Sequence, residues 1–169
     1  GVPTTTVWLK RGSDPRRGDV VVFSSPENGT KLVKRLIGLP GDVVEMRDEA
    51  LYINHRRMAY APLPDVAPGA LPQATAMLPH ELRSEALPGR EHTVMVLPEV
   101  RALRSFGPIT VPQDHYLMLG DNRDNSRDSR YFGLVPRKNL IARASHVALS
   151  FDPDHLYMPR LARMGKPLD

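Results

Sequence analysis

The chain has 169 residues, a formal net charge of +4 and no cysteine, which excludes disulfide bonds, thiolate metal sites and a cysteine nucleophile. No run approaches the roughly 20 apolar residues of a membrane-spanning helix. The 17 prolines break helices and mark turns, so the composition favours a fold rich in strands and loops.

Short β-branched runs separated by turn residues predict a series of strands. The first two lie at 19–25 and 31–38, and the segment 43–53 offers two strands around Arg47-Asp48-Glu49, which we predict to be a hairpin. Later in the chain the predicted strands lie at 92–100, 109–111, 116–121 and 142–151. Such a meander predicts a mainly β fold with a small β-barrel or sandwich as its core.

The composition changes between residues 59 and 108. The segment 61–79 is rich in alanine and proline and is predicted to be an extended loop, whereas 79–89 carries a weak helix signal between two prolines. We therefore expect a β core made of 1–58 and 109–169, with 59–108 as an inserted, Pro-rich subdomain of β-ribbon and loop.

A pair of adjacent cations, Lys34 and Arg35, lies inside the apolar strand LVKRLIG. Side chains alternate along a strand, so one of the two must point toward whatever the strand covers. An exposed strand lysine is common, but a lysine pressed against apolar groups loses hydration, which lowers its pKa. A neutral amine of this kind is a usable general base, as in a Ser-Lys dyad.

The segment 120–133, GDNRDNSRDSRYFG, is densely polar and lies between the apolar runs YLML and LVP. A polar stretch between two core segments is either a surface turn or the wall of a site. The six histidines form no metal-ligand pair at short spacing, so we expect no metal site and no cofactor.

Two motifs, KRLIGLPGD at 34–42 and GDNRDNSRDSR at 120–130, resemble the paired signature of type I signal peptidases, the S26-type Ser/Lys endopeptidases that remove signal peptides. The run GDVVVF at 18–23 is similar to the strand that precedes the lysine motif in that family. The run ARASHVALSFD resembles the family's closing strand. The resemblance covers most of the chain except the segment 59–108.

The resemblance implies a role for each matching residue. Lys34 would be the general base, and Ser126 would orient its amine through a hydrogen bond. The other residues carried over are structural supports and substrate contacts: Arg35, Asp121, Asp128 and Arg130 as supports, and Leu32, Val33 and Pro3 as substrate contacts. In this scheme an ion pair between Asp128 and Arg130 braces the polar loop.

The nucleophilic serine of the family lies two or three residues before a proline, and Pro3 in VPTTTVWL is the natural anchor here. A Ser-x-Pro pattern puts the serine where Gly1 stands, and a Ser-x-x-Pro pattern puts it immediately before residue 1. The interval from Pro3 to Gly18-Asp19 is similar to that of the conjugation-type branch, whose members use Ser-x-Pro. The nucleophile is therefore expected at or just before position 1.

The resemblance further implies cleavage after small residues. It also implies that an N-terminal anchor attaches the catalytic domain to the bacterial inner membrane, on the periplasmic side. Signal peptides of preproteins would be the partners. Three alternatives remain: an inactive homologue that only binds signal peptides, a self-cleaving repressor-type Ser/Lys protease, and a basic β-barrel that binds nucleic acid. The last needs clustered cations among exposed aromatic residues, whereas aromatic residues make up 6% of this chain and its cations are scattered, so no nucleic-acid partner is expected.

Overall fold

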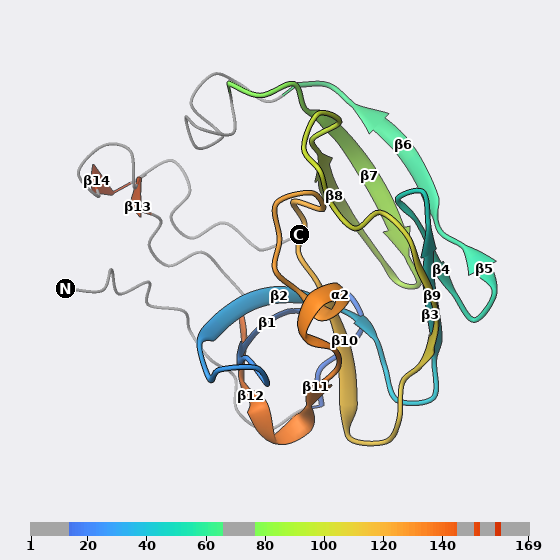
Figure 1. Ribbon diagram of the computed structural model, residues 1–169, viewed down its shortest axis with the longest axis vertical. Coiled ribbons are helices and arrows are strands. Elements are labelled where there is room, and N and C mark those ends of the chain that lie inside the picture. The colour runs from blue at the N-terminus through green and yellow to red at the C-terminus, as the bar shows by residue number, and fades with distance from the viewer. Residues whose placement is uncertain (1–13, 66–76, 145–150, 153–157, 160–169) are drawn as a thin grey trace.

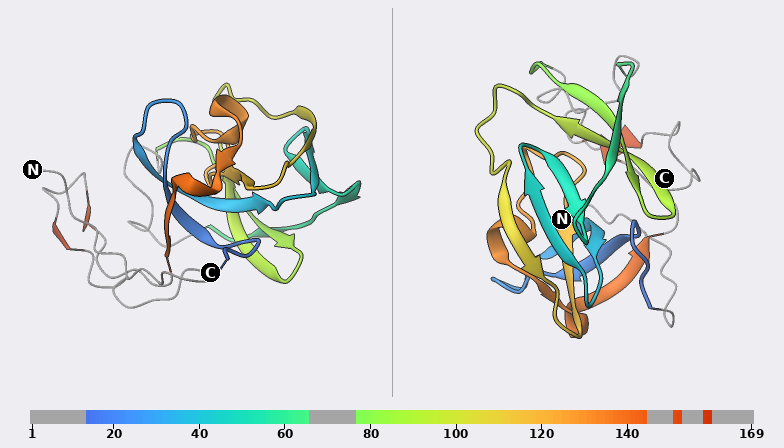
Figure 2. Two further views of the ribbon diagram at one scale, coloured as in Figure 1. Left: turned by 90° about the horizontal axis from the view of Figure 1, so that it is seen from below. Right: turned by 90° about the vertical axis from the view of Figure 1, so that its right-hand side faces the viewer.

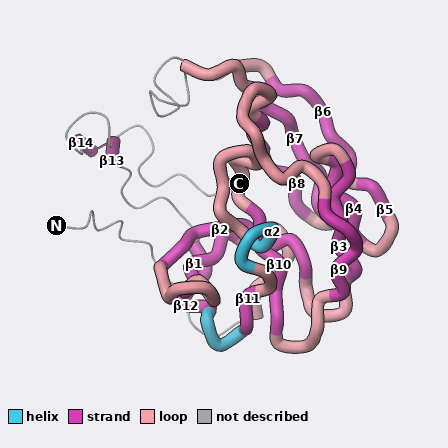
Figure 3. The backbone as a smooth tube through the Cα atoms, in the orientation of Figure 1, coloured by secondary structure: helices cyan, strands magenta, loops and turns pink. Residues whose placement is uncertain are grey.

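Strands dominate the protein, whose computed structural model describes residues 14–65, 77–144, 151–152 and 158–159. They form antiparallel sheets of five, four, three and two strands, and within the described residues none of these sheets closes into a barrel. Helix is confined to short turns (Figure 3). The predicted mainly β fold is therefore confirmed.

The five-stranded sheet has the strand order β11-β10-β2-β1-β12 and occupies the lower part of Figure 1. Its strands are β1 (Val20–Ser24), β2 (Lys31–Gly38), β10 (His115–Leu119), β11 (Val135–Pro136) and β12 (Leu140–Ala144). β1 and β2 lie where the sequence predicts them. The strand predicted at 142–151 overlaps the end of β12, and its residues 145–150 lie outside the described residues.

The four-stranded sheet has the order β5-β4-β3-β9 and consists of β3 (Val43–Arg47), β4 (Ala50–Ile53), β5 (Arg56–Arg57) and β9 (Phe106–Thr110). The turn between β3 and β4 is Asp48-Glu49, and both residues have positive φ, as a two-residue hairpin turn of type I′ requires. The predicted hairpin is therefore confirmed. In the right-hand view of Figure 2 it lies beside β9, which pairs with β3.

The three-stranded sheet corrects two predictions. It consists of β6 (Ala59–Leu63), β7 (Glu81–Leu87) and β8 (Arg90–Val96), at the upper right of Figure 1. The helix predicted over 79–89 is wrong, because β7 pairs along its whole length with β8 through a turn at Gly89, whose φ is +81°. The extended loop predicted over 61–79 is wrong at its start, because β6 runs to Leu63 and pairs with β7; residues 66–76 lie outside the described residues.

The remaining described elements are short: the helix α2 (Ser129–Phe132), a 3-10 helix at Arg137–Asn139, and the paired strands β13 (Phe151–Asp152) and β14 (Met158–Pro159). None of the helices within the described ranges is long and apolar enough to cross a membrane.

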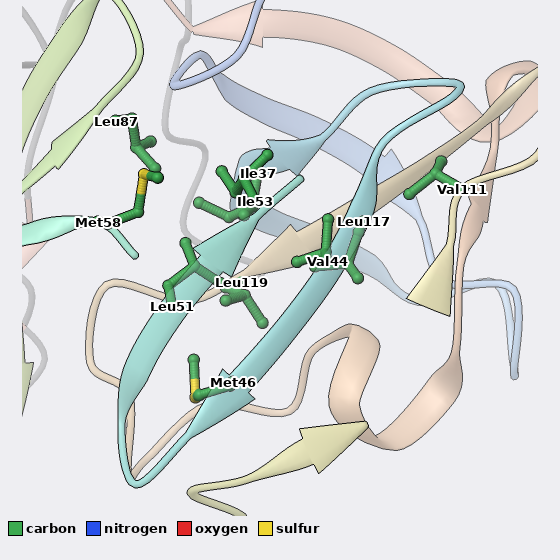
Figure 4. Close-up of a cluster of buried hydrophobic side chains, with 10 residues drawn as sticks. All are labelled: Ile37, Val44, Met46, Leu51, Ile53, Met58, Leu87, Val111, Leu117 and Leu119. Atoms are coloured by element: carbon green, nitrogen blue, oxygen red, sulfur yellow. The ribbon is translucent and has the colours of Figure 1, made fainter. Parts of the chain in front are cut away.

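Two apolar clusters cover opposite faces of β2 and β10. Ile37 and Leu117 belong to the larger cluster, which Figure 4 shows, whereas Leu36 and Met118 belong to the smaller one. The larger cluster also includes Leu87 of β7, which ties the three-stranded sheet to the core. Because β10 and the second half of β2 are buried on both faces, the strand that leads into the polar loop has a fixed position beside β2.

Candidate functional site

The candidate site lies where β2 runs beside β10 and the polar loop begins. Leu119 pairs with Arg35 in the antiparallel ladder, so Gly120 comes next to Lys34. A Cβ atom placed on Gly120 would stand 2.0 Å from Ser126 Oγ and 3.5 Å from Lys34 Nζ. The amine and the hydroxyl therefore converge on one glycine, which has no side chain to separate them.

Lys34 is half-buried, and burial is the main cause that lowers the pKa of its amine below the ordinary value of 10.5. The negative charges of Asp128 and Asp121 raise this pKa, and the positive charge of Arg130 lowers it. Because the loss of hydration outweighs the carboxylates, Lys34 releases its proton at a lower pH than an exposed lysine does.

The Ser126 hydroxyl is buried and makes no hydrogen bond of good geometry within the described residues. It lies close enough to Asp128 to help lower the pKa of that carboxyl. A buried hydroxyl without a committed partner is uncommon and is often associated with function. Here it lies against the same glycine as the lysine amine.

The ion pair between Asp128 and Arg130 holds the loop that carries Ser126. Arg130 Nε and Nη2 each donate to one Asp128 oxygen at 2.8 Å, and both side chains are buried. Asp128 also accepts from the Gly120 amide at 3.0 Å and caps the helix α2. Burial opposes ionisation of Asp128, but these donors hold its pKa below the ordinary value of 3.8.

A second bidentate pair holds the start of the loop against β2. Arg35 donates from Nε and Nη2 to the two oxygens of Asp121 at 2.9 and 2.8 Å, and from Nη1 to the Gly18 carbonyl at 2.8 Å. Arg35 is only 4% exposed although it is an arginine on a strand. A planar guanidinium fixes the direction of its partners, so the pair fixes the angle at which the loop leaves β10.

A cleft of about 240 Å³ opens beside these groups. It is lined by residues from β1, β2 and the polar loop: Val20, Val33, Lys34, Arg35, Gly120, Asp121, Asn122, Asn125 and Ser126. Val33 is 54% exposed at this cleft.

Among the residues that the structure describes, part of β2 has no partner strand on the edge beside the cleft. β1 pairs with Lys31–Arg35, whereas among the described residues β10 pairs only from Arg35 onward. Leu36 directs its backbone N–H and carbonyl toward the β1 side. Because hydrogen bonding alternates along an antiparallel strand, the backbone groups of Val33 point toward the open edge.

One of the predicted substrate contacts is not brought to the cleft. Leu32 packs against the smaller apolar cluster and does not line the cleft. Pro3 lies outside the described residues, as does position 1. The structure does bring together the other predicted residues: Val33, Lys34, Arg35, Asp121, Ser126, Asp128 and Arg130.

A family model described as signal peptidase, peptidase S26, matches residues 4–149 of the chain. The chain belongs to this family.

Relatives within the signal peptidase family are similar over most of the chain. Signal peptidase I of Pseudomonas fluorescens is 38% identical over 166 residues, which cover 90% of this chain and 56% of the relative. Signal peptidase I P of Bacillus subtilis subsp. natto is 35% identical, and the match covers 79% of this chain and 60% of the relative. The chain thus spans a little over half the length of these relatives.

A crystal structure of a signal peptidase I from Enterococcus faecalis V583 is 35% identical in sequence. The match covers 79% of this chain and 98% of that one, with a TM-score of 0.47.

In this member of the signal peptidase family, buried residues outside the two motifs also lie next to the site. Glu85 of β7 and His92 of β8 lie next to the polar loop, and Arg123 within the loop turns back toward both. Glu85 is 35 or more residues from the loop in sequence, so no local pattern signalled it. The structure contains no cluster of three or more metal-ligating side chains within the part it describes.

Proposed function

We propose that this chain is the catalytic part of a serine endopeptidase that removes N-terminal signal peptides from secreted preproteins, with Lys34 as the general base. The observation that carries the proposal is the half-buried Lys34 amine, whose pKa is lowered, beside the buried Ser126 hydroxyl. Ser126 orients the amine. The Asp128–Arg130 and Arg35–Asp121 pairs support the loop.

The reaction proceeds through an acyl-enzyme. A serine hydroxyl at or just before position 1 gives its proton to neutral Lys34 while its oxygen attacks the scissile carbonyl. The Lys34 ammonium then protonates the departing amine, which leaves an ester on the serine. Water gives a proton to Lys34 and attacks the ester. The Lys34 ammonium then returns this proton to the departing serine oxygen, which releases the new carboxyl group as its carboxylate and restores the serine and the neutral amine. A backbone N–H near the serine holds the oxyanion.

The substrate enters as an extended chain along the open edge of β2. Main-chain hydrogen bonds to Val33 align it, as in strand addition. The residue before the scissile bond lies in the cleft beside Val33 and Lys34, and in this proposal it is a small one. We place the enzyme at a bacterial inner membrane, with an N-terminal anchor before this chain and the site on the periplasmic side. In this scheme 59–108 is an inserted subdomain on the catalytic core.

The test compares two serine chains, one with Gly1→Ser and one with a serine added directly before Gly1. Each is assayed for cleavage of a preprotein, with the product identified by mass spectrometry. We expect one chain to cleave after the signal peptide. Lys34→Met should abolish this cleavage, whereas Lys31→Met, at an exposed position of the same strand, should leave it intact.

Cleavage by neither chain would overturn the proposal, and so would undiminished cleavage by Lys34→Met. Binding of a signal peptide without cleavage in both serine chains would instead support the inactive binding homologue.

A further inference from the structure

A buried ion pair joins the three-stranded sheet to the polar loop. Glu85 of β7 is fully buried and Arg123 of the loop is 2% exposed. Arg123 Nη1 and Nη2 donate to the two Glu85 oxygens at 2.8 and 2.6 Å. The Tyr60 hydroxyl of β6 also donates to Glu85. The carboxylate thus has three donors, which hold its pKa below 4.5 although burial opposes this.

Arg123 passes this constraint on to the site. Its Nε donates to the Gly120 carbonyl at 3.3 Å, and its own carbonyl accepts from Arg130 Nη2 at 2.6 Å. Its amide is fixed in turn by the carbonyl of Met95 in β8 at 2.9 Å. Arg123 therefore contacts both Gly120, against which Lys34 and Ser126 lie, and the arginine that pairs with Asp128.

His92 of β8 completes the surroundings of Glu85. Its Nε2 lies 3.4 Å from Glu85 and 3.8 Å from Asp121, and neither ring nitrogen has a hydrogen-bond partner within the described residues. Burial, with the nearby charge of Arg35, lowers the pKa of His92 to about 4. The ring is therefore neutral at neutral pH. It separates the Glu85 and Asp121 carboxylates, each of which already pairs with an arginine.

On the basis of the proposed function, we propose that Glu85 is a positioning residue for the peptidase site, acting through Arg123 on Gly120 to set where Ser126 meets Lys34. Glu85 lies in neither motif and comes from the segment that the sequence marks as an insertion. The inserted sheet then supplies a part of the site rather than a mere appendage.

If Glu85 only stabilised the fold, its replacement would leave the pKa of the Lys34 amine unchanged in the folded protein. The charges that shape the pKa of Lys34 are those of Asp128, Arg130 and Asp121. An effect of Glu85 on this pKa must therefore pass through the positions of the loop atoms. If Gly120 and Ser126 move away, water reaches the amine and its pKa rises toward 10.5.

The experiment uses four variants. Glu85→Gln keeps the size of the side chain and removes its charge, and Arg123→Lys keeps a charge without the bidentate geometry. The double variant Glu85→Met with Arg123→Met replaces the pair by apolar groups, which preserves many folds. Glu81→Gln, at an exposed position of the same strand, is the matched control.

Each variant is measured in two ways, with thermal unfolding as a check of the fold. The first is an NMR titration of Lys34 in protein labelled with [13Cε]-lysine, which needs no cleavage. The second is kcat and KM for a preprotein in the serine chain that cleaves. We expect the pKa of Lys34 to rise in all variants except Glu81→Gln. We expect kcat to fall by roughly 100-fold, with KM changed far less, because displacement of a reacting group by about 1 Å has this effect.

An unchanged Lys34 titration and an unchanged kcat in the folded double variant would overturn the proposal. Loss of the fold in all three site variants would also overturn it, in favour of a structural role alone. A raised Lys34 pKa together with absence of cleavage by either serine chain would refute the proposed function and leave the positioning role standing.

Discussion

Replacement of Gly120 by alanine is the most direct test of the site geometry. A methyl carbon there would stand 2.0 Å from Ser126 Oγ and 2.5 Å from Ser126 Cβ, whereas ordinary contacts begin near 3.4 Å. Ser126 must therefore move by roughly 1 Å or more, which costs about 100-fold in kcat by the usual sensitivity of catalysis to position. Overpacking of this kind destabilises a protein by about 1–3 kcal/mol, so Tm should fall by a few degrees.

The assay measures preprotein cleavage well below Tm and compares Gly120→Ala with Gly107→Ala. Gly107 lies in β9, and a Cβ there would meet nothing within 4 Å, so this control should behave like the parent chain. Cleavage at the parent rate by a folded Gly120→Ala protein would refute the reasoning, because the methyl group and Ser126 cannot occupy the same space.

Three other predictions follow from the same geometry. Lys34→Met should abolish cleavage and raise Tm at neutral pH, because burial makes the amine harder to charge in the folded protein. This gain in Tm should shrink as pH rises toward 10.5, where the unfolded chain also loses the lysine proton. Asp128→Asn should lower the free energy of unfolding at neutral pH, because the lowered pKa of Asp128 stabilises the fold while this group is charged. The variant should also lose less of that free energy below pH 3.8 than the parent chain does, which urea unfolding at several pH values measures. Val33→Pro removes an N–H that faces the open edge of β2 and should raise KM for preproteins with little change in Tm, which kinetics and thermal unfolding measure together.

Local sequence patterns predicted the parts of the fold that local forces decide. The run KLVKRLIG forms β2 over the predicted residues, and Asp48-Glu49 forms the predicted turn. Gly38 in the first motif also has a physical reason, because a Cβ there would stand within about 3 Å of side-chain atoms of Leu117, Val111 and Val44. These positions are constrained by their immediate neighbours, so their residue types carry the signal.

The errors fall where partners distant in sequence decide the structure. The segment 79–89 has a weak helix signal, but pairing with β6 on one side and β8 on the other makes it a strand. Tertiary pairing overrides a weak local preference of this kind. The same pairing brings Glu85 under the loop, where its partner Arg123 lies 38 positions later. No periodicity in the sequence reports such a contact.

The electrostatics of Lys34 explain why so many arginines are buried around it. An amine whose pKa is lowered by lost hydration is held in place against its own preference for water, so its surroundings must resist opening. The loop that carries the Ser126 hydroxyl is densely polar, so apolar packing alone does not hold it. Bidentate pairs can do so: Arg35–Asp121, Arg130–Asp128 and Arg123–Glu85 tie the loop to β2, to α2 and to β7. A single ion pair would let the loop rotate about it, whereas three ion pairs to different elements fix its orientation. Weakening the Arg123–Glu85 pair, whose charges are not among those that act on the Lys34 amine, should therefore raise the pKa of Lys34 before it unfolds the protein.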